Sequence, residues 1–525
     1  MATATELDIN TNATALQMAE EIFGAGVQIE DATYRGDAQS SGIYSGADSA
    51  TPGVAPADTG VILSTGHARD FTNNSGTSNT NESDNTSTNT NGVDNDADFN
   101  ALAGVRTRDA AFLEVDFIPE GDLLTLDFVL SSEEYPEFAN SQYNDVIGVW
   151  VNGVEAQVSI GNGKASIGNI NQGTAENVYV DNTSDQYNTE MDGFTITLTF
   201  VAPVNVGEVN SLKIGVADVA DSNYDTNLLV AGGSVQTGVV AQDDEAEFAV
   251  GKTRTLDVLE NDSDASGGVL TITHINGQPV AAGDTVTLST GQEITLNADG
   301  TFTVVTDADL ETVHFTYTAE NDQGNSDTGL VKLTQTVPCF LHGTMIRVPG
   351  GEVPVQDLRP GMQVMTYDHG PQTLRWIGRR RVTCTPDTTP IRFAPGSCGN
   401  DRPLLVSPQH RMLLRGNRAE MLFGTPEVLV KAKDMVDDHA IRPATDLAEV
   451  EYFHLLFGCH QLLWANGALS ESYQPGPESA TGFDAATLGE IQTLFPELCP
   501  DTGRGYGPSV RPALRSFEAR LLAAA

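Results

Sequence analysis

The chain has 525 residues, which predicts three or four domains, and it carries 72 Asp and Glu against 27 Lys and Arg. This negative charge argues against binding to nucleic acids or to anionic membranes, and it favours divalent cations and an extracellular location. The charge is uneven, because 52 of the acidic and only 9 of the basic side chains precede Cys339, and the remainder is nearly neutral. This break in composition predicts a domain boundary near residue 338.

The sequence shows no common targeting segment. No run of about 18 apolar residues occurs, so no transmembrane helix is expected. The chain starts Met-Ala-Thr-Ala-Thr-Glu, without the basic start and apolar core of a classical signal peptide, so export would need another signal. All five Cys residues lie from Cys339 onward, and their odd number leaves at least one thiol free.

Residues 1–235 predict an antiparallel β-sandwich preceded by one helix. Residues 13–23 have the spacing of an amphipathic helix capped by Asn12, with Leu16, Ala19 and Phe23 on one face. Apolar residues then alternate at 124–130, 194–200 and 212–216, which is typical of half-buried strands. Residues 72–96 are rich in Asn, Ser, Thr, Gly and Asp, which predicts a polar loop or a disordered insert.

Three aspartates, Asp94, Asp96 and Asp98, end this insert at alternate positions. The spacing is similar to the start of an EF-hand loop, but Phe99 stands where a Gly is needed and Val105 where a bidentate Glu is needed. We therefore exclude an EF-hand. A looser Ca²⁺ site and a solvated acidic loop are equally good interpretations.

Three motifs in this region resemble the choice-of-anchor L family of bacterial surface domains. They are Asp-Phe-Asn-Ala-Leu-Ala-Gly at 98–104, Ser-Ser-Glu-Glu-Tyr-Pro-Glu-Phe at 131–138 with Asn-Asp-Val-Ile-Gly at 144–148, and Ala-Asp-Val-Ala-Asp-Ser-Asn-Tyr-Asp at 217–225. The resemblance implies a secreted or surface-displayed sandwich without catalysis, whose ligand could be a polysaccharide, a protein or another extracellular surface. Glu133 and Glu134 could form an acid–base pair, but no second spaced carboxylate matches, so structural or cation-binding roles are favoured.

Residues 236–336 predict a second β-unit. Short strands at 270–275, 285–288, 294–296, 302–305 and 313–317, separated by turns, are typical of an immunoglobulin-like sandwich. The pattern resembles one cadherin-like module of bacterial adhesins. Clustered oxygen atoms suit Ca²⁺, and the candidate ligands are Asp244, Asn261, Asp262 and Asp264. Ordinary acidic turns explain these residues equally well.

Residues 338–475 carry the functional prediction. A Cys at position 339 can attack the carbonyl of the preceding residue, which moves the acyl group from nitrogen to sulfur and turns an amide into a thioester. Further blocks follow in order at 404–410, 451–456 and 460–467. This arrangement resembles the Hedgehog/intein (Hint) autoprocessing domains, and most closely the bacterial subgroup on surface proteins, which implies an all-β, horseshoe-like domain.

The resemblance assigns roles to individual residues. Cys339 matches the nucleophile of the family. Ser407 and His410 match its Thr-x-x-His block, in which the His protonates the departing amine and the hydroxyl orients the amide. His460 matches the penultimate strand. His454 lies near the position of an intein Asp, which leaves its role open.

Two departures from the family narrow the expected reaction. Inteins end in His-Asn, whose Asn cyclises, whereas Glu471-Ser472 stands at the aligned positions, so splicing is not expected. Hedgehog proteins activate a sterol with an Asp, and residues 376–379 offer none. We therefore expect a single cut between Pro338 and Cys339, completed by water or a small nucleophile and needing no cofactor. The hindered prolyl acyl group of Pro338 is expected to slow it.

Two other interpretations stay open. One is a structural Cys in a silent Hint fold within an adhesive surface protein. The other is a Zn²⁺ site built from Cys339, His410, Cys459 and His460, although adjacent Cys and His residues make tetrahedral ligation awkward. If the domain is active, the reaction is a single-turnover, cysteine-type autoproteolysis.

The complete prediction is a mainly β, multidomain chain. Two antiparallel β-sandwiches precede the all-β Hint domain, and residues 476–525 form a short helical tail with helices at 485–494 and 512–522. The predicted function is that of a self-processing, secreted or cell-surface, adhesin-like protein.

Overall fold

The structure is a computed structural model that describes residues 5–72, 86–139, 141–248, 253–307, 311–335, 339–384, 388–437, 439–473, 509–514 and 516–523. It is mainly β, which confirms the predicted fold class. Contacts divide the chain into two compact units. The first comprises Met1–Ala246, Thr255–Val304 and Val313–Lys332, and the second Glu247–Arg254, Val305–Thr312 and Leu333–Ala525. Most of the polar insert, Pro338 and the helix predicted at 485–494 lie outside the described residues.

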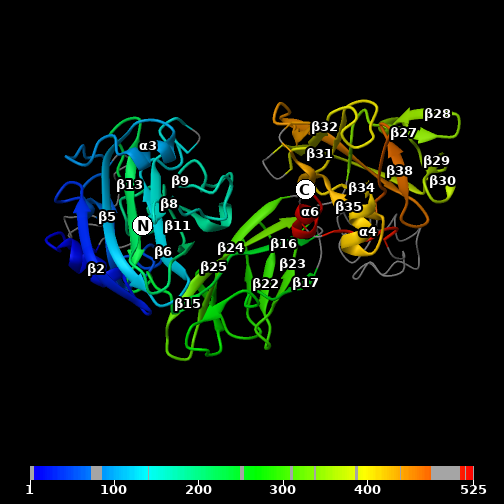
Figure 1. Cartoon of the computed structure of the whole chain (residues 1–525). Coiled ribbons are helices and arrows are strands. Elements are labelled where there is room, and N and C mark those ends of the chain that lie inside the picture. Colours follow the sequence, from blue (N-terminus) through cyan, green and yellow to red (C-terminus); the bar gives the residue numbers. More distant parts are fainter. Residues whose placement is uncertain are drawn as a thin grey trace. The chain divides into compact units, whose positions relative to one another are not determined.

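The first module is a sandwich of two antiparallel sheets (Figure 1). Its strands are β1 (Asp8–Asn10), β2 (Val27–Arg35), β3 (Ser41–Ser45), β4 (Thr59–Ser64), β5 (Thr107–Pro119), β6 (Leu123–Ser132), β7 (Val146–Val151), β8 (Val154–Glu155), β9 (Ala165–Ser166), β10 (Tyr179–Asp181), β11 (Gly193–Thr195), β12 (Leu198–Pro203), β13 (Asn210–Val219) and β14 (Thr226–Ala231). One sheet has the order β1-β3-β4-β14-β6-β11-β10, with β12 also on β6. The other has the order β2-β5-β13-β7-β8, with β9 on β7.

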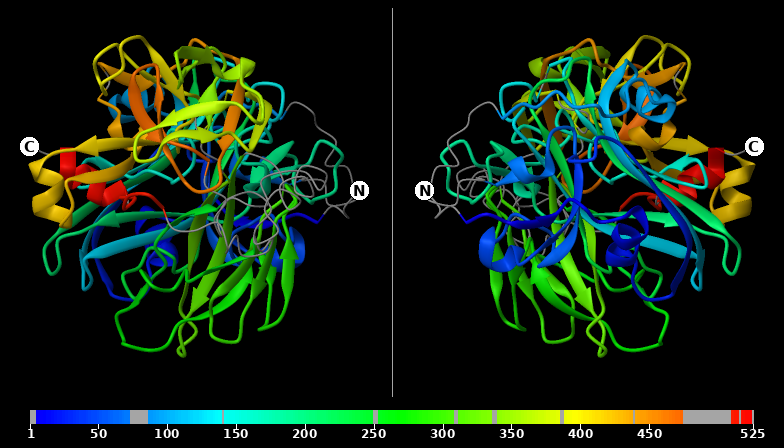
Figure 2. Two further views of the ribbon diagram at one scale, coloured as in Figure 1. Left: turned by 90° about the vertical axis from the view of Figure 1, so that its right-hand side faces the viewer. Right: turned by 90° about the vertical axis from the view of Figure 1, so that its left-hand side faces the viewer.

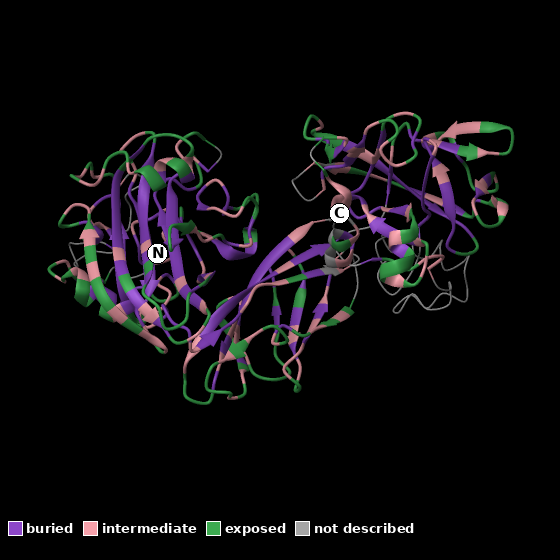
Figure 3. Ribbon diagram, viewed as in Figure 1, coloured by how far each residue is buried: buried purple, intermediate pink, exposed green. Residues whose placement is uncertain are grey.

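The core of this module lies between the sheets. Alternate residues of the central strands point into it, so Leu113, Val115 and Phe117 of β5 and Leu124, Leu126 and Phe128 of β6 belong to one apolar cluster. Figure 3 shows the central strands largely buried, whereas β2 at the sheet edge is mostly exposed or half-buried. The module also contains the helices α1 (Ala15–Ile22), α2 (Ala47–Ala50) and α3 (Ala97–Ala103) and the 3₁₀ turns η1 (Ala68–Phe71) and η2 (Glu176–Val178).

The predicted cap of the first helix was wrong, and of its predicted face Ala19 and Phe23 are buried but Leu16 is not. Thr14, not Asn12, caps α1: its Oγ1 accepts from Gln17 N at 3.2 Å, and the Gln17 side chain accepts from Thr14 N at 2.9 Å. This reciprocal capping box satisfies two backbone donors at once, which Asn12 cannot do from outside the helix. The exposed fraction of Leu16 is 47%. The buried face consists of Met18, Ala19 and Ile22.

The second module contains short strands in two sheets. They are β15 (Val239–Val240), β16 (Asp244–Phe248), β17 (Thr253–Leu256), β18 (Ser263–Asp264), β19 (Thr271–Ile275), β20 (Gln278–Pro279), β21 (Thr285–Thr287), β22 (Glu293–Leu296), β23 (Phe302–Val305), β24 (Thr312–Glu320) and β25 (Ser326–Gln335). The sheets have the orders β16-β25-β24-β19-β20 and β17-β23-β22-β21, and β15 pairs with β18.

The C-terminal module is also β-rich. Its strands are β26 (Phe340–Leu341), β27 (Met345–Val348), β28 (Gly351–Pro354), β29 (Gln363–Thr366), β30 (Gly370–Thr373), β31 (Trp376–Thr383), β32 (Ile391–Phe393), β33 (Leu404–Val406), β34 (Arg411–Arg415), β35 (Glu427–Lys431), β36 (Ile441–Pro443), β37 (Glu449–Leu456), β38 (Leu462–Ala465) and β39 (Ala468–Glu471). One sheet has the order β31-β37-β26-β33-β32-β36, and the other β28-β27-β38-β39-β34-β35 with β29 on β38 and β30 on β29.

Helices cover a small part of this module. Besides the 3₁₀ turns η3 (Val355–Asp357) and η4 (Ala432–Met435), it has α4 (Asn417–Phe423) and α6 (Ser516–Ala523). The two helices lie side by side in both Figures 1 and 2, and Ala419 and Ala519 join one apolar cluster with Val428, Val430 and Leu514. Part of the tail therefore packs on the module. Among the helices of the described residues, none is long and apolar enough to span a bilayer.

Candidate functional site

Strand register places Cys339 at the centre of the candidate site. Cys339 directly precedes β26, which lies between β33 and β37. Phe340 pairs with the last residue of β33 on one side and with Phe453 of β37 on the other. Because both pairings are antiparallel, the next position sets Cys339 opposite Ser407 and His454.

Ser407 holds the backbone of Cys339 in place. Cys339 N donates to Ser407 Oγ at 2.9 Å, and Ser407 N donates to Cys339 O at 3.1 Å. The Ser407 carbonyl accepts from His410 N at 3.0 Å, which closes a Ser-Pro-Gln-His turn. Pro408 suits the second position of such a turn because its φ is already fixed near the required value. One turn therefore positions both sequence-predicted residues of the block.

His454 lies beside the thiol. Its Nε2 is 3.6 Å from Cys339 Sγ. The Cys339 side chain is 1% exposed, and burial raises its pKa well above the ordinary value, so the thiol is uncharged at neutral pH. A buried thiol becomes a nucleophile when a neighbouring base takes its proton. His454 has the position for this role, which the sequence left open.

His410 is buried beside the same backbone. Its ring centroid is 4.4 Å from that of Phe340, with the rings at 61°. Both ring nitrogens are shielded from solvent and have no hydrogen-bond partner among the described residues. Burial lowers the pKa of His410 to about 4, a fall that Glu471 opposes and that His454, Arg411 and His460 reinforce. The folded protein therefore keeps this ring neutral at pH 7.

Glu471, on β39, anchors a buried cluster next to His410. Arg411 N donates to Glu471 Oε1 at 3.0 Å, and Arg411 Nη1 and His460 Nε2 each lie 3.4 Å from Oε2. Burial would raise the pKa of Glu471, but Arg411, His460 and His410 together hold it at about 2. His460 Nδ1 accepts from Val510 N at 3.3 Å, which leaves its Nε2 proton for the carboxylate. The predicted catalytic His460 thus contacts Glu471 and Val510.

The stability of this unit is expected to depend on the ionisation of His410. Its folded pKa of about 4 lies below the unfolded value of about 6.5, so between these pH values only the unfolded chain takes up the proton. The free energy of unfolding should therefore fall as the pH drops from about 6.5 to about 4. Urea unfolding across this range measures the slope of the free energy of unfolding against pH. His410→Asn should reduce the number of protons taken up on unfolding by about one. An unchanged slope in that variant would contradict the assignment.

The structure places the candidate Ca²⁺ ligands of the first module next to an ammonium group. Asp96 caps α3, and Lys213 Nζ lies 2.7 Å from Asp96 Oδ1 and 2.8 Å from Asp98 Oδ2. Asp94 Oδ1 accepts from Asp109 N at 3.4 Å. Lys213 therefore already supplies a positive charge to two of the three carboxylates.

In the second module, the candidate ligands form hydrogen bonds within the module, and Asp244 and Asp262 share Tyr317. The Tyr317 hydroxyl donates to Asp262 at 2.9 Å, Asn261 Nδ2 donates to the backbone carbonyls of Gln242 and Asp243, and the Asp264 carboxylate accepts from Ser266 and Gly268. Burial raises the pKa of Asp244 to about 8 and that of Asp262 to about 6.

No ready-made metal site is present in the described residues. There, no three His, Cys, Asp or Glu side chains come together at the spacing of a metal site, and this includes the four residues of the Zn²⁺ interpretation. Ca²⁺ binding at the candidate positions stays a prediction.

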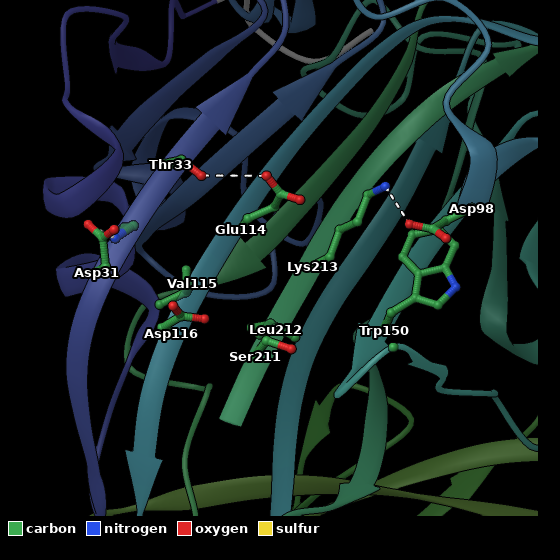
Figure 4. A pocket seen from close by; sticks show the side chains of 12 residues that line it. Asp31, Thr33, Asp98, Glu114, Val115, Asp116, Trp150, Ser211, Leu212 and Lys213 are labelled. Atoms are coloured by element: carbon green, nitrogen blue, oxygen red, sulfur yellow. Dashed lines mark hydrogen bonds and ion pairs between the residues drawn. The ribbon is translucent and has the colours of Figure 1, made fainter. Parts of the chain in front are cut away.

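A shallow hollow marks the face of the six-stranded sheet that points away from the core (Figure 4). It measures about 370 Å³, and β2, β5, β7 and β13 provide most of its lining. The lining includes Asp31, Glu114, Asp116, Trp150 and Lys213. The ammonium of Lys213 is paired with Asp96 and Asp98, and Glu114 is paired with Arg35 at 3.0 Å, so among the described residues Asp31 and Asp116 are the lining carboxylates without an ion-pair partner. A neutral or cationic ligand would suit this surface better than an anionic one.

Comparisons with protein families identify three modules. Residues 6–236 match the Choice-of-anchor L domain, residues 236–334 the Bacterial Ig domain and residues 338–477 the Hint domain. These matches confirm the recognition of a Hint domain preceded by choice-of-anchor L and immunoglobulin-like modules. No curated protein matches the chain significantly.

Comparisons with solved structures give only distant similarities. The gp41-1 intein is 13% identical, over 26% of this chain and 98% of the intein, with a TM-score of 0.18. The M60 catalytic domain with the CBM51-1 and CBM51-2 domains from Clostridium perfringens ZmpB is 9% identical, over 70% of this chain and 35% of that one, with a TM-score of 0.16. Extracellular domains 3–5 of Drosophila OTK are 11% identical, over 67% of this chain and 91% of that one, with a TM-score of 0.16. These scores are too low to support an argument about function.

Proposed function

We propose that the C-terminal module cuts its own chain once, between Pro338 and Cys339, through a thioester at Cys339. The observation that carries the proposal is the position of Cys339 between Ser407 and His454. The backbone nitrogen of Cys339, which must leave, donates a hydrogen bond to Ser407 Oγ at 2.9 Å. The sulfur of Cys339, which must attack, is 3.6 Å from His454 Nε2. The Hint-type fold over residues 338–477 supports the same reaction class.

In the proposed reaction, His454 takes the proton of the thiol as the sulfur attacks the carbonyl carbon of residue 338. The new C–S bond forms, the C–N bond breaks, and the freed amine of Cys339 takes up a proton. Ser407 orients the amide through its hydrogen bond, and His410 supplies the proton to the departing nitrogen. Water or a small nucleophile then attacks the thioester and releases the first 338 residues.

The proposed reaction ends in cleavage, without splicing. Glu471 stands where an intein would need its penultimate His, and its carboxylate accepts from Arg411 and lies 3.4 Å from His460 Nε2. A carboxylate and the Ser472 hydroxyl cannot form the cyclic imide by which an intein Asn releases its far end. The chain would therefore act once, as its own substrate, without a cofactor.

The test is to incubate the purified chain with and without hydroxylamine or dithiothreitol, and to sequence the products from their N-termini. Both reagents attack thioesters readily and amides hardly at all, so they should speed the cut. We expect a near-neutral fragment that starts at Cys339 and no joined product. A fragment that starts elsewhere, or no cleavage under any of these conditions, would favour a silent Hint fold in a structural surface protein.

Variants of the proton-transfer residues should separate their roles. His410→Ala and His454→Ala are each expected to slow cleavage by about 100-fold or more, which is the usual scale for losing a general acid or base. Ser407→Ala should cost less, because its hydroxyl orients the amide without transferring a proton. Because few His410 rings carry a proton at pH 7, the rate should rise as the pH falls, and His410→Ala should remove that rise. Gel densitometry over time measures the cleavage rate of each variant. Equal rates in all three variants would contradict the assignment of proton transfer to the two histidines and of orientation to Ser407.

Choice-of-anchor L and bacterial immunoglobulin-like modules suggest a surface or extracellular protein. We propose that the acidic part before Cys339 is the adhesive portion, with a polysaccharide or protein ligand, and that cleavage separates it from the C-terminal module. The excess of acidic over basic residues before Cys339, 52 against 9, supports exposure to an aqueous, cation-rich environment.

A further inference from the structure

Four buried carboxyl groups meet at one end of the first sandwich. Glu134 follows β6, Asp145 precedes β7, Asp218 lies near the end of β13 and Asp225 precedes β14. β14 runs antiparallel to β6 in one sheet and β7 antiparallel to β13 in the other, and a hydrogen bond from Thr226 to Asp145 joins the two pairs of strand ends. Each of the four residues is at most 3% exposed.

Hydrogen bonds satisfy only part of this cluster. Asp145 Oδ1 accepts from Val219 N at 2.8 Å, and Asp145 Oδ2 accepts from Thr226 Oγ1 at 2.6 Å. In contrast, three buried oxygens have no hydrogen-bond partner among the described residues. They are Glu134 Oε2, Asp218 Oδ1 and Asp225 Oδ2.

The electrostatic environment of the cluster is unfavourable for four charged carboxylates. Among the charged groups, Asp145 has the largest effect on both Glu134 and Asp218, and the other charged groups that act on the cluster are also carboxylates. With burial as the main cause, the pKa of Glu134 rises to about 10 and that of Asp225 to about 7. Buried like charges are costly unless a cation pairs with them.

The end of the polar insert contacts one member of this cluster, Asp225, and two further carboxylates. Thr88 N donates to Asp225 Oδ1 at 2.6 Å, Thr86 N donates to Glu133 Oε1 at 3.0 Å, and Thr90 N donates to Asp109 Oδ2 at 3.4 Å. Every second residue of this segment thus presents its N–H group to a carboxylate. These donors fix one oxygen of Asp225 and leave its other oxygen available to a ligand.

We propose that Glu134, Asp145, Asp218 and Asp225 bind one Ca²⁺ ion, at a site separate from the clusters at 94–98 and 244–264. Ca²⁺ takes about six to eight oxygen ligands in irregular geometry, whereas Mg²⁺ demands a near-ideal octahedron. Because no three of the described acidic side chains already stand at metal spacing, the carboxyl groups must rotate together around the ion. In this rotation, the oxygens without a hydrogen-bond partner, Glu134 Oε2, Asp218 Oδ1 and Asp225 Oδ2, would turn toward the ion.

Calorimetric titration and thermal unfolding of the full chain, after removal of metals by EDTA, test the proposal. Ca²⁺ at about 100 times its Kd should raise the Tm of the first module by about 5–10 °C, and Mg²⁺ should do so much less. Asp225→Asn and Asp145→Asn should weaken Ca²⁺ binding by about 30-fold or more. In EDTA, however, both variants should be at least as stable as the wild type, because each removes a buried acidic charge.

The controls locate the site. Asp122→Asn removes an exposed carboxylate from the turn between β5 and β6 of the same module and should leave Ca²⁺ binding unchanged. Asp94→Asn and Asp262→Asn test the two other clusters and should also retain this binding event. Equal Ca²⁺ affinity in Asp225→Asn and the wild type would overturn the proposal, as would an Mg²⁺ effect as large as that of Ca²⁺. If Asp225→Asn and Asp145→Asn lost as much stability in EDTA as in Ca²⁺, the two carboxyl groups would have a purely structural role, and this result would also overturn the proposal.

Discussion

Replacing Cys339 by Ala is expected to abolish cleavage of the chain, because no sulfur remains to accept the acyl group. The intact 55.7 kDa chain should then persist even with hydroxylamine, since that reagent acts on the thioester and not on the peptide bond. Cys339→Ser should retain slow cleavage, because a hydroxyl can accept the acyl group as an ester but is a weaker nucleophile than a thiol. Intact mass spectrometry over time measures all three proteins.

The other cysteines provide matched controls. Cys459 is an exposed free thiol, and Cys398 is a free thiol that is partly buried. Cys459→Ala and Cys398→Ala should cleave at the wild-type rate, because neither sulfur is proposed to touch the acyl group. If Cys459→Ala lost activity together with Cys339→Ala, the Zn²⁺ interpretation would gain support. Undiminished cleavage in Cys339→Ala would refute the thioester mechanism.

The mainly β fold could be predicted because the alternating pattern is local. Leu124, Leu126 and Phe128 alternate in the sequence and point into the core in the structure. Short helices could not be predicted in the same way from the local sequence pattern. Helix α3 has only seven residues and directly follows the acidic end of the insert, and its Asp96 cap was interpreted as either a cation ligand or part of a solvated acidic loop. Local signals of this length compete with one another, and tertiary contacts decide between them.

Site residues that lie close together in the sequence could be predicted better than those that only the fold brings together. Ser407 and His410 share one turn, so their spacing in the sequence already relates them. His454 reaches Cys339 only through the pairing of β26 with β37, and the sequence alone does not fix that register. The Glu471 cluster needs β34, β39, the loop before β38 and the tail, and the carboxyl groups of the first module come from four strand ends.

Removing the carboxylate of Glu471 is expected to destabilise the C-terminal module strongly. Glu471→Ala leaves Arg411 and His460 without their buried partner, and breaking a buried ion pair on one side costs about 3–5 kcal/mol. The Arg411 side chain is 26% exposed, so solvent should reduce the loss to about 2–4 kcal/mol. Urea unfolding of the full chain at neutral pH, followed for the transition of this module, measures it.

Two comparisons make the Glu471 prediction specific. Glu471→Gln keeps the shape and one acceptor, so it should cost less than Ala. Glu427→Ala removes a more exposed partner, which pairs with Arg511 at 2.6 Å, and should cost about 0–1 kcal/mol. Because Glu471 raises the pKa of His410, both Glu471 variants should also slow cleavage at a given pH and shift its rise to lower pH. A Glu471→Ala protein as stable as Glu427→Ala, with an unshifted pH profile, would show that the buried carboxylate neither holds this module together nor supports His410.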